Sequence, residues 1–358
     1  MNAPLKVGLL GFGYASATFH APLIASTPGL QLAAIASSRP SDVLATWPHV
    51  SVMATPAELL AQPDIDLVVV ATPNATHAPL AAQALVAGKH VVVDKPFTLN
   101  LSEAQDLIAL AQSHNRLLSV FHNRRWDSDF LSIRDLLAQG FLGRITHFES
   151  HFDRFRPLVR HRWRESAQAG GGLWFDLGPH LVDQALQLFG APQSLWLDQA
   201  QQRDASQTDD WFHAVLSYGQ MRVILHATAL SAHLAPRFTV HGTRGSLIKQ
   251  GLDTQEDALK AGQRPGSPAW GRDPNGLELH LLNDVDQMTA YTQPCLHGDY
   301  LQYYKQIHDA VTQGKSNPVP PHEALSVMKL IAMGQESART GCNQMMTEGL
   351  SNGAVFTA

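Results

Sequence analysis

The segment GGGLWFDLGPHLVDQAL, residues 170–186, carries two side chains that could do acid–base chemistry. Asp176 and His180 lie four positions apart, a spacing that places two side chains on one face of a helix. A carboxylate and an imidazole so placed are typical of a general acid–base pair, of part of a metal site, or of a polar helix surface. The 31 acidic residues and 18 histidines of the 358-residue chain give about 1.6 such pairs at any one spacing by chance. The pair therefore needs support from other residues.

A second candidate, Lys95, follows three consecutive valines in VVVDKPFTLN, residues 91–100. If the valines form a buried parallel strand, Lys95 lies at the sheet edge where such sheets bind ligands. Partial burial beside cationic or apolar groups lowers a lysine pKa toward the range that proton transfer requires. The alternative is a surface lysine whose aliphatic stem covers the strand end.

A glycine-rich loop in GLLGFGYAS, residues 8–16, fits a dinucleotide site. Gly11 and Gly13 follow an apolar run, and Ser16 stands where a third glycine is usual. A tight turn lets the backbone approach a pyrophosphate, and the N-terminus of the following helix offers free N–H groups to it. We therefore expect a nicotinamide dinucleotide to bind here.

The end of the second predicted strand, IASSRP, indicates which dinucleotide is bound. Ser37, Ser38 and Arg39 stand where an NAD-preferring site usually has an acid for the ribose 2′-hydroxyl. Hydroxyls and a guanidinium suit a 2′-phosphate. NADP(H) is expected in preference to NAD(H), which stays an alternative, as does a purely solvated Arg39.

Other polar residues follow predicted strand ends. Thr72, Pro73 and Asn74 are expected to line the ribose and nicotinamide, while His77 begins the next helix, where a structural role is favoured. The candidates for contacts with substrate hydroxyls are His122, Asn123, Arg124, Arg154, Arg156 and Tyr303. For each arginine a salt bridge is an equal alternative.

The elements that must position these residues change character along the chain. Up to about Phe121, apolar runs such as LKVGLL and DLVVVAT alternate with helical segments, which predicts a parallel sheet with helices on both faces. One helix is expected to end at Gly88 and the next to begin with Ser102 as its N-cap. Beyond His122, extended runs such as WFHAVLSYG and MRVILHATAL follow one another, which predicts a mostly antiparallel sheet.

The expected fold class is α/β, with two domains. Residues 1–122 are predicted to form an N-terminal Rossmann domain with a doubly wound parallel sheet, and residues 123–358 a C-terminal α+β domain with a large, mostly antiparallel open sheet. Within the second, residues 170–186 are expected to form one helix and 252–292 long loops, before two helices near 300–312 and 323–337.

Composition excludes several functional classes. A net charge of -5 with 16% charged residues gives no basic face for nucleic acid. No apolar run approaches a membrane span, and the start MNAPLKVGLLGFG lacks the features of a signal peptide, so we expect a cytoplasmic protein. Cys295 and Cys342 offer neither a disulfide framework nor zinc spacing.

Taken together, GFGYAS, DKP and GGGLWFDLGPH resemble the glucose-fructose oxidoreductase and inositol dehydrogenase family, Gfo/Idh/MocA. Further strings, among them SVFHNRRWDSDFL and RFRPLVRHRWRE, are similar to its branch of NADP-dependent scyllo-inositol dehydrogenases. The resemblance implies hydride transfer between a cyclic polyol or sugar and the nicotinamide, and a homodimer or dimer of dimers. Another sugar or keto-sugar substrate is the alternative, as is a regulator that binds NADP without turnover.

The resemblance also implies roles for particular residues. Lys95 and His180 would share proton transfer, Asp176 would orient them and bind a hydroxyl, and the Lys95–Pro96 peptide is expected to be cis. Asp94 replaces the glutamate usual in the family. The residues so implied to contact the cofactor are Gly11, Phe12, Gly13, Tyr14, Ser16, Ser37, Ser38, Arg39, Thr72, Pro73, Asn74, His77, Asp94, Lys95, Pro96, Asn123, Trp163 and Arg164. No metal is expected, because His151, Asp153 and His161 form no recognised ligand pattern.

Overall fold

The computed structural model describes residues 3–160 and 162–346. Contacts between residues divide the chain into two compact units, each made of three segments. The first consists of Met1–Trp126, Thr254–Trp270 and Asp299–Leu325, and the second of Asp127–Asp253, Gly271–Gly298 and Ser326–Ala358. The division differs from a single boundary after residue 122, because two later segments return to the first unit.

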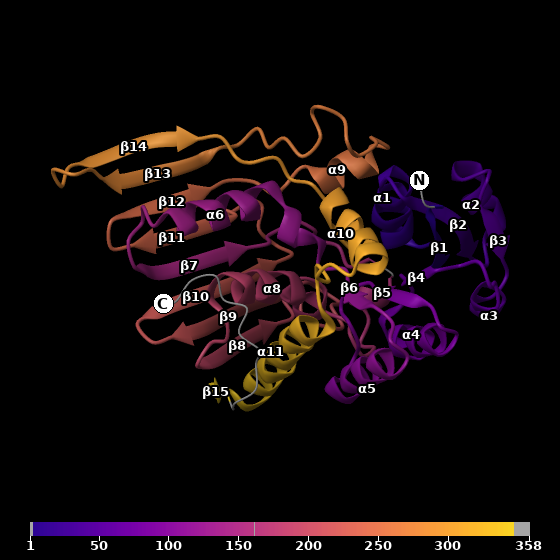
Figure 1. The fold of residues 1–358 in the computed structure, drawn as a ribbon. Helices are drawn as coiled ribbons and strands as arrows, with labels where there is room; N and C mark the ends of the chain where they lie inside the picture. Colours follow the sequence, from indigo (N-terminus) through magenta and orange to yellow (C-terminus); the bar gives the residue numbers. More distant parts are fainter. Residues whose placement is uncertain (1–2, 161, 347–358) are drawn as a thin grey trace. The chain divides into compact units, whose positions relative to one another are not determined.

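A six-stranded, fully parallel sheet forms the centre of the first unit, in the order β3-β2-β1-β4-β5-β6 (Figure 1). This is the Rossmann order. Its strands are β1 (Leu5–Leu10), β2 (Leu30–Ala36), β3 (Ser51–Met53), β4 (Leu67–Val70), β5 (His90–Val93) and β6 (Leu118–Val120). All four residues of β4 are buried, as expected for a strand covered on both faces. The predicted parallel sheet is confirmed.

Helices and helical turns connect these strands and complete the first unit. They are η1 (Ser16–His20), α1 (Ala21–Ser26), α2 (Pro40–Thr46), α3 (Pro56–Leu60), η2 (Asn74–Thr76), α4 (His77–Val86), α5 (Leu101–Ser113), η3 (Asn123–Trp126), α9 (Gln255–Lys260) and α10 (Leu301–Gln313). Gly88 lies just beyond α4 with a φ of 75°, as a helix C-terminus favours. The expected N-cap of α5 was wrong, because the side chain of Asn100, and not that of Ser102, accepts the backbone N–H of Glu103.

The second unit contains a nine-stranded sheet in the order β14-β13-β12-β11-β7-β10-β9-β8-β15. Only β7 and β10 pair in parallel, so the sheet is mostly antiparallel, as predicted. Its strands are β7 (Ile145–His151), β8 (Ser194–Ala200), β9 (Trp211–Tyr218), β10 (Met221–Thr228), β11 (Phe238–Gly242), β12 (Gly245–Lys249), β13 (Leu277–Leu282), β14 (Met288–Gln293) and β15 (Gln344–Met345).

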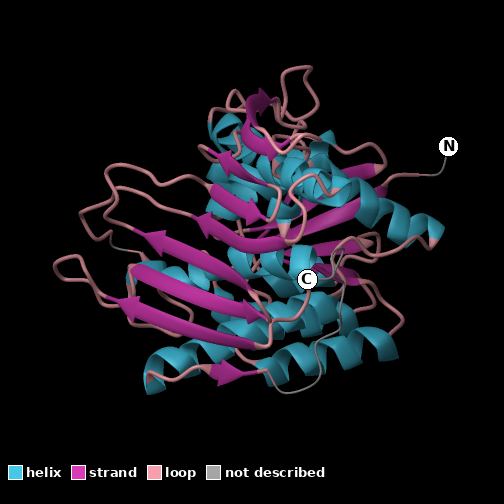
Figure 2. Ribbon diagram, turned by 90° about the vertical axis from the view of Figure 1, so that its left-hand side faces the viewer, coloured by secondary structure: helices cyan, strands magenta, loops and turns pink. Residues whose placement is uncertain are grey.

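The two faces of this sheet differ. Alternate residues of β9 and β10 are buried, among them Phe212, Leu216 and Val223, and this face is covered by helices (Figure 2). The helices of the unit are α6 (Ser128–Gln139), η4 (Trp163–Glu165), α7 (Leu173–Asp176), α8 (Gly178–Phe189) and α11 (Pro321–Thr340), which begins in the last segment of the first unit. The intervening residues of β9 are only partly buried and form the open face of the sheet.

Two expectations about this part of the chain were wrong. Residues 252–292 are not long loops, because they contain α9, β13 and β14, and the alternation in LELHLL marks β13 as a strand with one buried face. Residues 170–186 do not form one helix, because the helix is interrupted at Leu177, between the end of α7 and the start of α8. Pro179 lacks a backbone N–H, which favours a helix beginning at this point.

None of the described helices is long and apolar enough to cross a membrane. The expected cis peptide between Lys95 and Pro96 is present. Both cysteines, Cys295 and Cys342, are free thiols.

A buried ion pair supports the first turn of α6 in the second unit. Lys249 Nζ lies 3.0 Å from Asp273 Oδ2, and both side chains are fully buried. The same carboxylate accepts the Ser128 hydroxyl at 3.1 Å. Removing one charge leaves the other buried without its counter-ion.

We therefore expect Lys249→Met to lower the free energy of unfolding by about 3–5 kcal/mol, because it leaves the Asp273 carboxylate unpaired. Urea titration measures the change. Lys315→Met is the matched control, since its ion pair with Asp309 is at the surface, where water screens the two charges and little stability depends on them. Equal effects of the two substitutions would show that the buried pair has no special importance.

Candidate functional site

The glycine loop after β1 is shaped by the neighbouring strand ends. Gly11 has a φ of 85°, and its N–H donates to the carbonyl of Ala36 at 3.0 Å. A Cβ at Gly11 would meet the Ala71 carbonyl oxygen and Thr72 Cγ2 at 3.0 Å, so glycine is required here. At Gly13 an added Cβ would meet no atom within 4 Å. The loop therefore leaves open space beside the backbone where a pyrophosphate would approach.

The helix that follows this loop fits the same group. Its first element, η1, has π-type hydrogen bonding, and Ser16 at the start of η1 is fully buried. The Ser16 hydroxyl has no hydrogen-bond partner among the described residues. A buried hydroxyl in a helical turn directly after an open glycine loop suits a phosphate oxygen, since such a turn presents free N–H groups to anions. The residues present therefore fit a dinucleotide.

Arg39 reaches from the end of β2 back to the glycine loop. Its Nη2 donates to the Phe12 carbonyl at 2.6 Å, and its Nη1 lies 3.2 Å from Asp42. The Ser37 hydroxyl accepts the N–H of Arg39 at 3.0 Å, which fixes the turn between them. The structure thus brings together a guanidinium and a hydroxyl where sequence analysis placed the 2′-phosphate, with Ser38 exposed beside them.

The loops that follow β4 and β5 are tied together by His77. Its ring is buried, with Nδ1 2.8 Å from the Pro96 carbonyl and Nε2 3.0 Å from the Thr72 carbonyl. Burial lowers the pKa of His77, while the nearby Asp94 carboxylate acts in the opposite direction. These contacts agree with the structural role favoured from the sequence. In the β4 loop Asn74 is buried and Pro73 is exposed.

Asp94 anchors the residue that precedes Lys95. Its Oδ1 accepts the N–H of Lys95 at 2.8 Å, and its Oδ2 lies 4.0 Å from His20 Nε2. His20 Nδ1 in turn is 2.6 Å from the Tyr304 hydroxyl on α10. Burial alone would raise the pKa of Asp94, but His20, Lys95 and His77 outweigh it and lower the pKa to about 2. The carboxylate stays charged and holds the start of the cis segment in place.

The helix α9 contributes a residue that sequence analysis missed. Glu256 accepts the Tyr14 hydroxyl at 2.8 Å and Arg124 Nη2 at 2.7 Å. Burial would raise the pKa of Glu256, but Arg124 and Tyr14 lower it to about 2. Arg124 therefore has the salt bridge that was the alternative to substrate binding. Residues 252–292 were expected to form long loops, and the link of Glu256 to Tyr14, 242 positions away, is visible only in the fold.

The other substrate candidates of the first unit are buried. Tyr303 is fully buried among Phe121 and Trp126, and its hydroxyl donates to Ser119 Oγ at 2.9 Å. Tyr303 therefore packs in the core and does not make the expected contact with a substrate, because no face of its ring is left for a ligand. His122 and Asn123 are 2% and 4% exposed, which leaves them little surface for a substrate.

In the second unit, Asp176 lies at a cavity rich in arginine. Arg164 Nε is 3.5 Å from Asp176 Oδ1. The expected substrate residues Arg154 and Arg156 line the same cavity, together with Glu165 and other residues. Burial and the neighbouring arginines lower the pKa of Arg156 to about 10. The structure therefore brings four predicted residues to one polar, positively charged cavity that could bind hydroxyls or oxyanions.

The same cavity shows further residues that sequence analysis missed. Asp209 Oδ2 accepts the N–H of Trp174 at 2.7 Å and so caps α7. Arg203 pairs with Glu165 at 3.1 Å and with Asp210 at 2.9 Å, which holds the segment before η4. His180 lies in the first turn of α8, and its backbone N–H donates to the carbonyl of Leu177 at 3.1 Å. His180 is 6% exposed.

The glycine run has a structural explanation. Gly172 has a φ of 97°, and a Cβ there would overlap the Asp209 carboxylate. A Cβ at Gly171 would lie too close to the Ser166 carbonyl oxygen. At both positions the close neighbours are therefore protein atoms, and these explain why no side chain is present. Trp163 belongs to η4, and its side chain lies outside the described residues, as does His161.

Comparisons with known proteins agree with this architecture. Residues 5–122 match the model of an oxidoreductase family with an NAD-binding Rossmann fold, and residues 134–346 match that of the C-terminal alpha/beta domain of an oxidoreductase family. The chain is 54% identical to the uncharacterized oxidoreductase YdgJ of Escherichia coli, over 95% of this chain and 98% of YdgJ. It is 37% identical to scyllo-inositol 2-dehydrogenase (NADP(+)) IolW of Bacillus subtilis, over 94% of both chains.

A solved structure supports the same conclusion. The putative oxidoreductase YPO2259 from Yersinia pestis is 53% identical and superimposes with a TM-score of 0.94, covering 98% of this chain and 99% of that one. The two chains therefore share their fold over nearly their whole length.

The two glycines of the loop give a matched test of the dinucleotide site. We expect Gly11→Ala to destabilise the protein by about 1–2 kcal/mol, because alanine is strained at a positive φ. Gly13→Ala should leave the melting temperature unchanged and weaken binding of the nicotinamide cofactor at least about tenfold, because its methyl group fills the open space beside the loop. Thermal unfolding and fluorescence titration measure the two effects. Unchanged cofactor affinity in Gly13→Ala would place the pyrophosphate elsewhere.

Proposed function

The chain belongs to the Gfo/Idh/MocA family of oxidoreductases, and from this premise we propose that it is an NADP-dependent dehydrogenase of a cyclic polyol or sugar. The substrate that we favour is scyllo-inositol together with its 2-keto form. The observation that carries the proposal is the polar, arginine-lined cavity at Asp176 in a chain that also has a glycine loop suited to a dinucleotide. The similarity to IolW supports the choice of substrate and cofactor.

The preference for NADP(H) is supported by the surroundings of Arg39. The Arg39 side chain is 59% exposed and its guanidinium is held at the glycine loop by the Phe12 carbonyl, so N–H groups stay available to a 2′-phosphate. Asp42 competes for the same guanidinium but is itself half exposed. No carboxylate occurs among Ser37, Ser38 and Arg39 at the position where an NAD-preferring site usually has an acid.

For the chemistry, we assign proton transfer to Lys95 and His180. When bound, the nicotinamide accepts or supplies the hydride. His180 takes the alcohol proton in oxidation, and Lys95 polarises the same oxygen; in reduction the roles reverse. Asp176 binds a hydroxyl and orients its neighbours. The anchoring of the Lys95 backbone by Asp94 supports this assignment, because proton transfer requires a fixed donor position.

The substrate class is supported by the side chains around Asp176. Arg154, Arg156 and Arg164 offer many N–H donors, and Asp176 offers an acceptor, so a ligand with several hydroxyls can pair with all of them. A screen of polyols and ketoses with NADP(H), followed at the nicotinamide absorbance, tests the proposal. Binding of NADPH without turnover of any of these compounds would favour a regulator instead.

The cofactor preference is tested by Arg39→Ala. We expect the substitution to weaken binding of NADPH about 10- to 100-fold, because a charge-assisted contact is lost, and to leave NADH binding unchanged. Fluorescence titration with each cofactor measures this. Arg339→Ala serves as the control, since that exposed residue pairs with Glu336 in the second unit. Comparable kcat/KM of the unmodified enzyme with both cofactors would contradict the preference.

The catalytic assignment is tested by Lys95→Met and His180→Asn. Each is expected to lower kcat about 10²- to 10⁴-fold, because each removes one general acid–base group, while NADPH still binds. Steady-state kinetics with the substrate found in the screen measures kcat, and Lys315→Met is the control at an exposed surface lysine. A near-normal kcat in Lys95→Met would remove Lys95 from the mechanism.

A further inference from the structure

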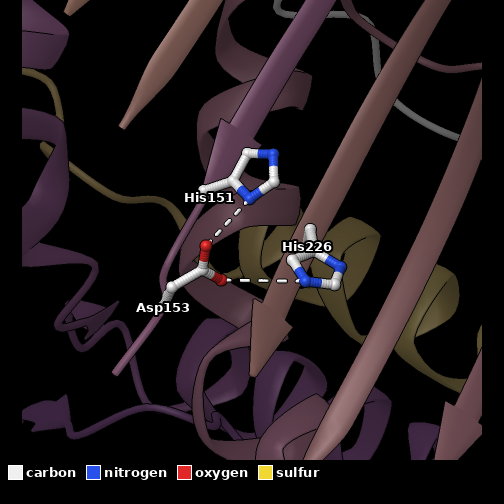
Figure 3. Close-up of side chains that lie close together, drawn as sticks. All are labelled: His151, Asp153 and His226. Carbon is white, nitrogen blue, oxygen red and sulfur yellow. Dashed lines mark hydrogen bonds and ion pairs between the residues drawn. The ribbon is translucent and has the colours of Figure 1, made fainter. Parts of the chain in front are cut away.

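A cluster of two histidines and one aspartate lies apart from the cavity at Asp176. His151, Asp153 and His226 converge at the junction of β7 and β10, as Figure 3 shows. None of the three lines the cavity at Asp176, and the proposed dehydrogenase mechanism uses none of them. They belong to the half-buried face of the nine-stranded sheet, because successive side chains of its strands alternate between the two faces.

The backbone fixes the positions of all three residues. His151 and His226 are directly paired across the parallel strands β7 and β10. The pairing continues beyond β7, because the N–H of Phe152 donates to the His226 carbonyl and that of Arg154 to the Thr228 carbonyl, both at 2.9 Å. This extended backbone directs Asp153, two positions after His151, to the same face. The cluster is therefore built on a hydrogen-bonded sheet and not on a mobile loop.

The distances suit a small cation. His151 Nδ1 lies 3.1 Å from Asp153 Oδ2, and His226 Nε2 lies 3.8 Å from Asp153 Oδ1. One ligand atom from each of the three residues lies within 4.8 Å of the others. Ligands about 2.0–2.1 Å from a tetrahedral Zn²⁺ stand roughly 3.4 Å apart, so small side-chain rotations complete the arrangement. The side chains of His151, Asp153 and His226 are 16%, 5% and 13% exposed, respectively. An ion can therefore reach the cluster from solvent.

The residues around the cluster have the pattern of an outer ligand shell. His151 Nε2 lies 2.7 Å from Glu149 Oε1, so the ring can donate a proton there while Nδ1 faces the cluster. His226 Nδ1 lies 3.4 Å from His213 Nδ1. Histidine ligands of metals usually donate their second N–H to a carboxylate or another polar group, which fixes the tautomer.

From these contacts we propose that His151, Asp153 and His226 bind a divalent transition-metal ion of the Zn²⁺ type on the open face of the sheet. Two imidazoles and one carboxylate are the donor set that such ions take, whereas Mg²⁺ and Ca²⁺ require oxygen ligands. An ordinary ion pair in the same sheet differs from this cluster. On β13, His280 Nε2 lies 2.8 Å from Glu278 Oε1, and the two side chains are 39% and 55% exposed. Among the described residues no third ligand joins them. The bound ion joins β7 to β10 and stabilises the fold.

The test uses the tag-free full chain after treatment with a chelator and dialysis. Calorimetric titration with zinc sulfate is expected to show one ion bound per chain, and magnesium chloride is expected to give no binding. Zinc should also raise the melting temperature, because it binds only the folded protein. Asp153→Asn and His226→Gln should each abolish the binding. Glu149→Gln, which alters only the outer shell, should weaken it about 10- to 100-fold.

His280→Gln is the matched control, since it removes a histidine from the same sheet outside the cluster, and its zinc affinity should equal that of the unmodified chain. Circular dichroism of each variant confirms that it is folded. The absence of zinc binding by the unmodified chain would overturn the proposal. So would binding that persists in folded Asp153→Asn and His226→Gln, because zinc would then occupy other groups.

Discussion

The site of the first unit depends on the parallel pairing of β1 with both β2 and β4, and of β4 with β5. Because parallel strands point the same way, their carboxyl ends meet at one edge, and the loops that follow them are forced into contact. Gly11 shows the consequence, since its close neighbours are the Ala71 carbonyl oxygen and the Thr72 side chain. His77 then fastens the β4 loop to the β5 loop through two backbone carbonyls. The place of the Lys95 backbone follows from these contacts.

The second constraint is the free-energy cost of burying charge. In both units the buried charged groups have partners of opposite charge or hydrogen-bond donors. Asp94 would be costly to bury alone, but His20 beside it and the N–H of Lys95 keep it charged. Arg124 and Tyr14 keep the Glu256 carboxylate charged in the same way. In the second unit Arg203 bridges Glu165 and Asp210. The contacts of Glu256 with Tyr14 and of Arg203 with Glu165 join segments far apart in the chain, so these polar groups fix the arrangement of loops that apolar packing alone would leave free.

The sequence predicts what depends on local pattern. Continuous valine runs indicate β4 and β5, alternation indicates β9 and β10, and the glycine loop indicates the dinucleotide turn. It fails where a partner is remote or where two local signals compete. Asn100 and Ser102 are both good N-caps, and only the backbone geometry decides between them. Glu256 and Asp209 could not be found, because their roles come from Tyr14 and Trp174, which no periodicity links to them.

The segment after β7 shows most clearly why spacing alone misleads. In an extended chain, consecutive side chains point to opposite faces, so neighbours in sequence serve different surroundings. Arg154 lies over the Phe152 ring at 4.8 Å and lines the cavity at Asp176, whereas Asp153 between them pairs with His151. His151 and Asp153 form no recognised ligand pattern with His161, so the sequence predicts no metal for them. The residue that joins them, His226, is 73 positions beyond Asp153 and is brought there by the pairing of β7 with β10. The extended segment that directs Arg154 into the cavity therefore directs Asp153 away from it and toward His151 and His226.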